Sequence, residues 1–217
     1  MAKVGVLLSG CGVYDGAEIH EAVLTLLALD RAGAEIVCMA PNTDQMHVVD
    51  HTTGKVTGER RNVLVESARI ARGDIRDLAR VKAADIDALI LPGGFGAAKN
   101  LSDFAVAGAA AKVHPEVARL LREMVAAKKP VGAMCIAPAV LAAVLGKGGA
   151  ELTIGTDAGT ASTLEKMGVK HVPCPVHEDR LDARRKLVST PAYMLAGRIS
   201  EAAAGIEKLV ADVLRLA

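Results

Sequence analysis

The stretch PVGAMCIAPAVLAAVLG, residues 130–146, decides the fold. Its first part is typical of a buried strand. The part after Cys135 is typical of a helix, with Pro138 near the start, where the missing N–H of a proline costs nothing. A sharp strand-to-helix turn requires small residues two before and two after its centre, and Ala133 and Ala137 occupy these places. We therefore predict a nucleophile elbow centred on Cys135.

This turn has a consequence for the thiol. The dipole and the free N–H groups at a helix N-terminus favour a thiolate over a thiol. We therefore expect a depressed pKa for Cys135, which makes this residue the first candidate for a nucleophile.

The beginning of the chain indicates a parallel sheet. An apolar strand at 3–9 is followed by the loop SGCGVYDG (9–16), a helix at 17–32 and a second strand at 35–40. Such a βαβ start favours right-handed crossovers between parallel strands. Further strands are expected in the same sheet at 87–91, 151–154, 171–172 and 186–189, and helices at 115–128, 158–167 and 199–216. The fold class is α/β, and residues 1–217 are predicted to form a single domain.

The composition excludes several classes of partner. The chain is 51% hydrophobic but has only two Phe, two Tyr and no Trp, so few side chains are available to stack on bases. Its formal net charge of +1, with acidic and basic residues interspersed, indicates neither a nucleic acid nor a membrane surface as partner. The apolar run at 130–146 is shorter than the ~20 residues of a spanning helix. We expect a soluble protein.

The cysteines indicate a reducing compartment. They stand at positions 11, 38, 135 and 174, without the spacing of zinc ligands and without a CxxC pair. No metal site is predicted. Reduced thiols and the lack of a recognisable targeting segment predict a cytoplasmic location.

Glycine-rich loops follow two of the predicted strands. In an open α/β sheet, ligands bind at the carboxyl ends of the strands, where SGCGVYDG, PGGFG (92–96) and Cys135 are expected to meet. The N–H groups of Gly93 and Gly94, together with that of Ile136, are candidates to hold an oxyanion. The pattern leaves open that PGG is merely a tight turn. GCG lacks both phosphate-binding patterns, GxGxxG and GK[ST].

Two glutamates on the first predicted helix are candidate acids. Glu18 falls in the first turn, where an acidic residue complements the helix dipole. Glu21 comes one turn later and flanks the apolar stripe, so its carboxyl group would be desolvated and able to exchange a proton with a thiol. From the pattern alone, an ordinary surface position remains the commoner interpretation of Glu21.

Other residues are assigned by their place along the chain. Cys11 stands at the end of the first predicted strand and could lie near Cys135, as a neighbouring or resolving thiol, or simply as a buried filler. Tyr193 follows the strand at 186–189 and could line the pocket. No histidine follows the strand after the elbow helix, where Gly155, Thr156 and Asp157 stand instead.

Four motifs together carry a resemblance to a known family: SGCGVYDGAEIHEAV, PGGFGAAKNL, GAMCIAPA and STPAYMLA. The chain resembles the ElbB-like branch of the PfpI/ThiJ superfamily, which has the class I glutamine amidotransferase-like fold. The resemblance implies a homodimeric, flavodoxin-like three-layer sandwich with a mostly parallel sheet. It also implies a reactive cysteine at Cys135, a neighbouring acid at Glu21 and an oxyanion loop at Gly93 and Gly94.

The resemblance further implies an activity. Members similar to ElbB are cofactor-free glyoxalases that convert 2-oxoaldehydes to 2-hydroxy acids and are linked to isoprenoid biosynthesis. Relatives elsewhere in the superfamily place a histidine where this chain has Gly155–Asp157. That departure disfavours a Cys–His–Glu triad, and with it amidase, protease and glutamine-hydrolysing activity.

We therefore expect glyoxalase chemistry on methylglyoxal or glyoxal, without glutathione. Cys135 and Glu21 would carry the reaction, and Glu18 or Asp157 would be the next choice for a base. The alternative is a redox-responsive or chaperone-like regulatory protein that uses the same cysteine. A weaker third hypothesis is an amidotransferase-like subunit that needs a synthase partner.

Overall fold

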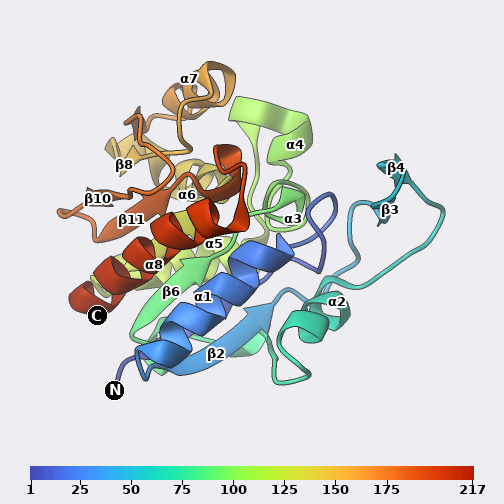
Figure 1. Ribbon diagram of the computed structural model, residues 1–217, viewed down its shortest axis with the longest axis horizontal. Coiled ribbons are helices and arrows are strands. Elements are labelled where there is room, and N and C mark those ends of the chain that lie inside the picture. The colour runs from blue at the N-terminus through green and yellow to red at the C-terminus, as the bar shows by residue number, and fades with distance from the viewer.

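A seven-stranded sheet forms the centre of the computed structural model, which describes residues 1–217 (Figure 1). The strand order is β10-β11-β7-β6-β1-β2-β5, and all neighbouring strands are parallel except β10 and β11. The strands are β1 (Lys3–Leu7), β2 (Glu35–Ala40), β5 (Arg76–Asp77), β6 (Ala88–Leu91), β7 (Val131–Met134), β10 (Arg180–Asp182) and β11 (Leu187–Thr190).

Eight α-helices surround this sheet. Their bounds are α1 (Ile19–Arg31), α2 (Val63–Ile70), α3 (Phe95–Lys99), α4 (Phe104–Ala107), α5 (Pro115–Ala126), α6 (Pro138–Leu145), α7 (Ala158–Lys166) and α8 (Ile199–Leu216). In Figure 1, α1 and α8 lie side by side across the face of the sheet that is turned to the viewer.

The core consists of two apolar layers, because successive side chains of a strand point to opposite faces. Val4 and Val6 of β1 pack with α1 and α8 in a cluster of 20 buried residues. Leu7 of β1 belongs to the opposite cluster of 28 buried residues, which includes α5 and α6. The predicted three-layer α/β sandwich with a mostly parallel sheet is confirmed.

Two of the expected strands do not extend the sheet. β8 (Glu151–Leu152) and β9 (Lys170–His171) pair only with each other, in a separate two-stranded parallel sheet. The edge of the central sheet at β11 is already occupied by the antiparallel strand β10, whose Leu181 pairs with Val188. The prediction that 151–154 and 171–172 continue the sheet was therefore wrong.

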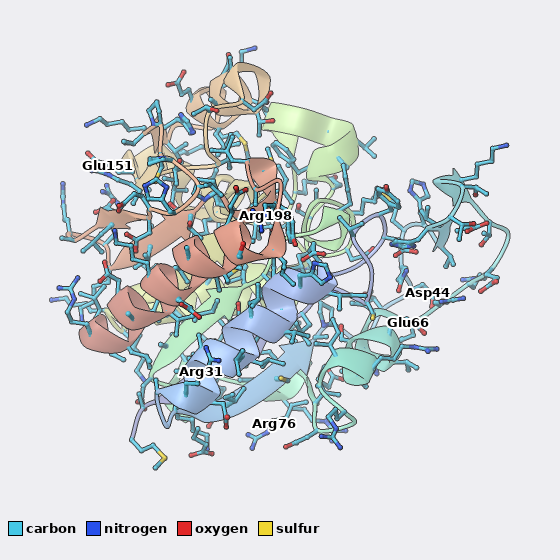
Figure 2. All side chains as sticks on the ribbon, viewed as in Figure 1. Arg31, Asp44, Glu66, Arg76, Glu151 and Arg198 are labelled. Atoms are coloured by element: carbon cyan, nitrogen blue, oxygen red, sulfur yellow. The ribbon has the colours of Figure 1, made fainter.

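One hairpin lies outside the central sheet. β3 (Val49–Asp50) and β4 (Lys55–Val56) form a hairpin that projects from the body (Figure 1). Charged side chains of both signs are spread over all parts of the fold (Figure 2), in keeping with a net charge of +1. None of the helices combines the length and the apolar character that crossing a bilayer would require.

Candidate active site

Cys135 stands at a strained turn between β7 and α6. Its φ of +58° lies in the left-handed region, which costs a residue with a side chain of order 1–3 kcal/mol. Its N–H donates to the carbonyl of Thr190 at 3.0 Å and so extends the pairing of β7 with β11 to the turn. Ala133 and Ala137 are fully buried on either side. The predicted elbow is confirmed.

Glu21 of α1 lies beside this cysteine and is fully buried. Its Oε2 accepts a hydrogen bond from the N–H of Gly93 at 2.8 Å, and its Oε1 accepts one from the N–H of Tyr193 at 3.1 Å. Burial nevertheless dominates and raises the pKa of Glu21 to about 7, with the nearby Glu18 adding to the shift. The carboxyl group also lies beside Cys135, since a Cβ built on Gly93 would be 2.7 Å from Glu21 Oε2 and 2.5 Å from Cys135 Cβ.

Gly93, which donates one of the hydrogen bonds to Glu21, stands where there is no room for a side chain. A Cβ at Gly93 would come within 2.5 Å of Cys135 Cβ and 2.7 Å of Glu21 Oε2, so only glycine fits between acid and thiol. Because its N–H points to Glu21, Gly93 is not free to hold an oxyanion. The prediction for Gly93 is corrected: this residue positions the acid.

The prediction of a depressed pKa for Cys135 was wrong. Burial and, after it, the neighbouring Glu21 carboxyl raise the pKa of this thiol well above its ordinary value, although the N–H groups of Gly94 and Ile136 point at it and act in the opposite direction. The helix α6 begins only at Pro138, so Cys135 lies outside its first turn. Its side chain is also only 8% exposed, and this desolvation outweighs the dipole.

The thiol faces a cavity of about 340 Å³. Nine of the twelve lining residues are hydrophobic. Gly94, Cys135 and Ile136, as well as Glu18, lie in its wall, so the predicted thiol and two of the three predicted oxyanion donors meet there. The full set is Val13, Glu18, Gly94, Phe95, Ala98, Phe104, Ala105, Cys135, Ile136, Thr160, Tyr193 and Met194.

Tyr193 contributes twice to the site. The preceding Ala192 has a φ of +44°, which turns the chain after β11 so that the backbone N–H of Tyr193 reaches Glu21. The ring lines the cavity, and the hydroxyl oxygen lies 2.8 Å from Nδ1 of His20 on α1. The sequence gives no signal for the left-handed turn at Ala192, because alanine rarely adopts it.

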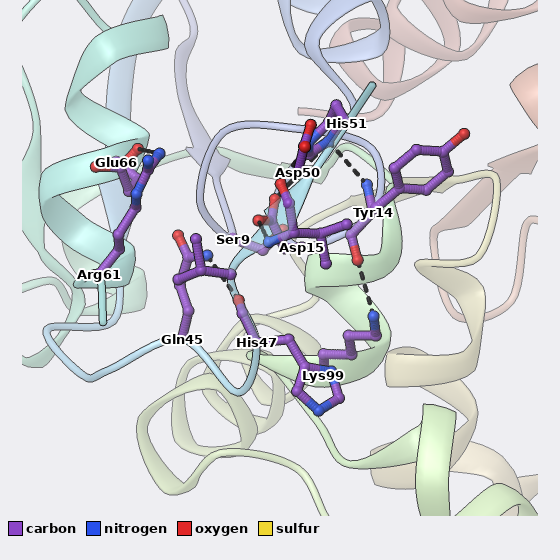
Figure 3. Close-up of polar contacts among 12 residues, drawn as sticks. Ser9, Tyr14, Asp15, Gln45, His47, Asp50, His51, Arg61, Glu66 and Lys99 are labelled. Carbon is purple, nitrogen blue, oxygen red and sulfur yellow. Dashed lines mark hydrogen bonds and ion pairs between the residues drawn. The ribbon is translucent and has the colours of Figure 1, made fainter. Parts of the chain in front are cut away.

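The loop that follows β1 serves as a structural clamp. The Asp15 carboxylate is buried and accepts the N–H of Val49 at 2.7 Å, and the N–H of Tyr14 donates to His51 at 3.2 Å (Figure 3). Lys99 donates to the carbonyl of Tyr14 at 2.8 Å. These contacts tie the loop to the projecting hairpin on one side and to α3 on the other.

A second set of contacts joins that loop to the PGG segment. The N–H of Phe95 donates to the carbonyl of Val13, and the N–H of Gly96 to that of Gly16, each at 2.8 Å. The N–H of Glu18 donates to the carbonyl of Gly93 at 3.0 Å. The convergence of the two glycine-rich loops with the elbow, expected from the strand order, is therefore present.

Cys11 is not brought to the reactive centre. It is partly exposed, and the charged groups that act on it are Glu66, Arg69 and Asp15, none of which acts on Cys135. Burial, followed by Glu66, raises its pKa. It does not line the cavity, and all four cysteines are free thiols. Cys11 is therefore not among the residues that form the wall of the cavity at Cys135.

The two alternative bases have different positions. Glu18 caps α1, where its Oε2 accepts the N–H of Glu21 at 2.7 Å, and it also lines the cavity. Asp157 caps α7 by accepting the N–H of Thr160 at 2.7 Å, and it is exposed. This hydrogen bond lowers the pKa of Asp157. Asp157 is therefore a helix cap and not part of the centre.

No histidine lines the cavity. His171 comes nearest in the chain to the segment where the superfamily's histidine would be expected, and its Nε2 accepts the N–H of Ile154 at 3.3 Å. Among the residues that line the cavity, Cys135 therefore has no histidine partner. No cluster of side chains suited to hold a metal ion is present.

Relatives of known name cover almost the whole chain. A human protein described as glutamine amidotransferase-like class 1 domain-containing protein 3, mitochondrial, is 51% identical and aligns with 99% of this chain and 83% of its own length. A rat ES1 protein homolog, also described as mitochondrial, is 50% identical, with 99% and 84% covered.

These relatives correct the predicted location. Their mitochondrial descriptions contradict the cytoplasmic location expected from the cysteines and from the lack of a targeting segment. Free thiols indicate only a reducing environment, and the folded domain itself carries no mark that distinguishes one such compartment from another.

Solved structures agree with the fold. An isoprenoid biosynthesis protein with an amidotransferase-like domain from Ehrlichia chaffeensis is 40% identical, with a TM-score of 0.93 over 100% of this chain and 99% of the other. DJ-1beta of Drosophila melanogaster, 21% identical, shares the fold with a TM-score of 0.57 over 100% and 96% of the two chains. The model of the DJ-1/PfpI family matches residues 11–179. The chain belongs to the DJ-1/PfpI family.

Proposed function

We propose that the protein is a glutathione-independent glyoxalase that converts 2-oxoaldehydes, such as methylglyoxal and glyoxal, to 2-hydroxy acids. The observation that carries the proposal is the pair formed by Cys135, which lines a cavity, and Glu21, which is fully buried beside it. A nucleophilic sulfur at the cavity thus stands next to a carboxyl group whose pKa is raised to about 7. Such a carboxyl group can both accept and release a proton near neutral pH.

The first step is addition of the thiol to the aldehyde. Cys135 Sγ bonds to the aldehyde carbon while its proton passes to the Glu21 carboxylate, so the pair keeps its single negative charge until the charge appears on the aldehyde oxygen. The N–H groups of Gly94 and Ile136 point at the sulfur and so are close to that oxygen in the hemithioacetal. Glu21 then returns the proton to the oxygen.

The second step moves a proton between neighbouring carbons. The Glu21 carboxylate removes the hydrogen from the former aldehyde carbon, and an enediolate forms next to the sulfur. Glu21 then delivers the proton to the former ketone carbon, while the hydroxyl proton on the former aldehyde carbon passes to the neighbouring oxygen, and a thioester of the 2-hydroxy acid remains on Cys135. Water cleaves the thioester, which releases the acid and restores the thiol. The net reaction adds one water to the 2-oxoaldehyde.

Tyr193 supplies a polar contact for the second carbonyl group. The cavity wall is mainly hydrophobic, and the Tyr193 hydroxyl group, hydrogen-bonded to His20, stands near the acid that its backbone holds. A hydrogen bond from this hydroxyl group to the ketone oxygen would stabilise the enediolate that develops in the second step.

The two alternatives have less support. Rapid oxidation of a sensor cysteine requires an exposed thiolate, whereas Cys135 is buried and has a raised pKa. Hydrolysis of glutamine by a cysteine normally relies on a histidine base, and no histidine lines this cavity. The glyoxalase reaction needs only the thiol, the carboxyl group and the N–H groups that are present.

The test is a product analysis. Purified protein is incubated with methylglyoxal in the absence of glutathione, and lactate is followed by proton NMR. Parallel reactions contain glutamine, to detect glutamate and ammonia, or hydrogen peroxide, to detect oxidation of Cys135 by mass spectrometry. Lactate formation proportional to protein concentration is expected. Absence of lactate, with rapid and selective oxidation of Cys135, would instead support the redox alternative.

A further inference from the structure

The aromatic residues of this chain are concentrated at one place. The sequence has two Phe, two Tyr and no Trp. Three of these four side chains, Phe95, Phe104 and Tyr193, line the cavity at Cys135. The fourth, Tyr14, lies outside it against His51, with ring centroids 4.9 Å apart. The buried core is built without any aromatic residue.

Core packing accounts for only part of this distribution, because Phe104 and Tyr193 pack against the two core clusters whereas Phe95 packs against neither. Aromatic rings bury a large apolar area with few rotatable bonds, which makes them effective contacts for an apolar ligand. Phe95 remains 48% exposed even though it lines the cavity, so its ring gains little from the folded chain itself. Part of this exposed surface would be covered by a ligand in the cavity.

The cavity is also larger than the smallest substrates need. A water molecule takes about 30 Å³ of liquid volume, so 340 Å³ has room for roughly ten groups of that size. Methylglyoxal has five non-hydrogen atoms, and most of these are polar carbonyl atoms. Beyond the thiol, the wall offers Val13, Phe104 and Met194, which cannot satisfy a carbonyl group but match an alkyl group.

We propose that the site is built for 2-oxoaldehydes whose ketone carbon carries an apolar group larger than methyl. The aldehyde carbon would lie at Cys135 Sγ, the ketone oxygen near Tyr193, and the apolar group against Phe95, Phe104 and Met194. This inference rests on the proposed glyoxalase function and specifies the class of substrate for the same reaction.

The test is a series of 2-oxoaldehydes of increasing length: methylglyoxal, 2-oxobutanal, 2-oxopentanal and 2-oxohexanal. Burying one methylene contributes about 0.8 kcal/mol, so kcat/KM is expected to rise about fourfold per carbon and roughly fifty-fold over the series. The gain in kcat/KM is expected mainly as a lower KM, with kcat little changed, because the apolar contact is the same in the bound substrate and in the transition state.

Two cavity variants and one control variant test whether the residues of the cavity cause this rise in kcat/KM. Ala105→Phe adds a ring to the wall, and Phe95→Ala removes one; both are expected to lower the ratio of kcat/KM for 2-oxohexanal to that for methylglyoxal by about tenfold. Val106→Phe is the matched control, because this neighbour of Ala105 is 76% exposed and does not line the cavity. It is expected to leave the ratio unchanged.

The outcomes separate the two claims. Turnover of methylglyoxal with no gain along the series would overturn the inference about the apolar group and leave the glyoxalase function standing. A gain that survives both cavity variants would also overturn it, because the selectivity would then arise elsewhere. Failure to turn over any member of the series, 2-oxohexanal included, would overturn the glyoxalase function itself.

Discussion

The two thiols that follow parallel strands, Cys135 after β7 and Cys11 after β1, have much in common. Both lie near the carboxyl edge of the sheet, both are free, and burial raises the pKa of both. They differ in their neighbours. Cys135 has a left-handed backbone, the buried Glu21 carboxyl group beside it and an open cavity in front of it. Cys11 has Glu66 and Asp15 for neighbours and lines no cavity.

The comparison shows that the pKa of a thiol does not by itself identify a reactive cysteine. A raised pKa suppresses the resting thiolate at both positions. Only at Cys135 is there a buried carboxyl group, with a pKa raised to about 7, that can take the proton when substrate arrives, and N–H groups that can receive the charge. The reactivity of Cys135 therefore depends on the groups around it, and it appears when a substrate occupies the cavity.

Among changes at the two thiol sites, the largest effect on activity is expected from replacing Glu21, the acid beside Cys135. Glu21→Gln should lower kcat/KM for methylglyoxal by about 10²–10⁴-fold, because the amide cannot shuttle a proton. The activity of the wild-type protein should rise with pH through about 7, as Glu21 becomes a carboxylate. Glu66→Gln, which changes the acid beside Cys11, is the control and should keep the activity. Full activity in Glu21→Gln would assign the base elsewhere, with Glu18 the nearest choice.

The Glu21 carboxyl group should also make the free energy of unfolding depend on pH. In the folded protein the pKa of Glu21 is raised from 4.5 to about 7, so between these values the folded state holds a proton that the unfolded state has lost. The free energy of unfolding should therefore fall as pH rises from 4.5 to 7, by on the order of 3 kcal/mol from this group. Urea titrations of wild type and Glu21→Gln across this range measure it, and identical pH profiles would contradict the assignment.

A smaller effect is expected at the glycine between acid and thiol. Gly93→Ala places a methyl group 2.5 Å from Cys135 Cβ and should cost about 1–3 kcal/mol of stability while it displaces the pair. Gly58→Ala is the matched control, since nothing lies within 4 Å of the added carbon. The melting temperature and kcat/KM of both variants test this prediction. Equal values for Gly93→Ala and Gly58→Ala would contradict it, because the pair formed by Glu21 and Cys135 would then tolerate the added methyl group.

The smallest change is expected at the hydroxyl group of Tyr193. Tyr193→Phe keeps the backbone N–H that holds Glu21 and removes only the bond to His20 and the proposed contact to substrate. One hydrogen bond corresponds to about 0.5–1.5 kcal/mol, so kcat should fall roughly three- to tenfold. The pH profile should not shift, because Glu21 is untouched. A shifted profile would instead place Tyr193 in the proton transfer.

Much of this centre could be predicted because it rests on local rules. Small residues two positions away from Cys135 are required by the turn itself. For Glu21 the pattern makes a buried acid only the less common interpretation, and the family resemblance selects this residue. The two glycine-rich loops were expected to meet because parallel strands bring their carboxyl ends to one edge. The four motifs of the family resemblance cover the same loops.

The predictions that failed concern features that depend on contacts between segments far apart in the sequence. The N–H of Gly93 reaches Glu21 only because the PGG loop is bonded to the start of α1. The left-handed turn at Ala192 has no signature, since alanine does not favour it. The pKa of Cys135 is set by complete burial, which a local dipole argument omits. β8 and β9 are too short for their pattern to indicate which sheet they join.

The most direct test of the central claim is a paired measurement on the two thiols. Lactate formation from methylglyoxal without glutathione is measured for wild type, Cys135→Ala and Cys11→Ala, with circular dichroism to confirm that each variant is folded. Loss of at least about 10³-fold is expected in Cys135→Ala, since removing the nucleophile removes the covalent route. Cys11→Ala should keep the wild-type rate within about twofold. Equal turnover by Cys135→Ala and wild type would contradict the account.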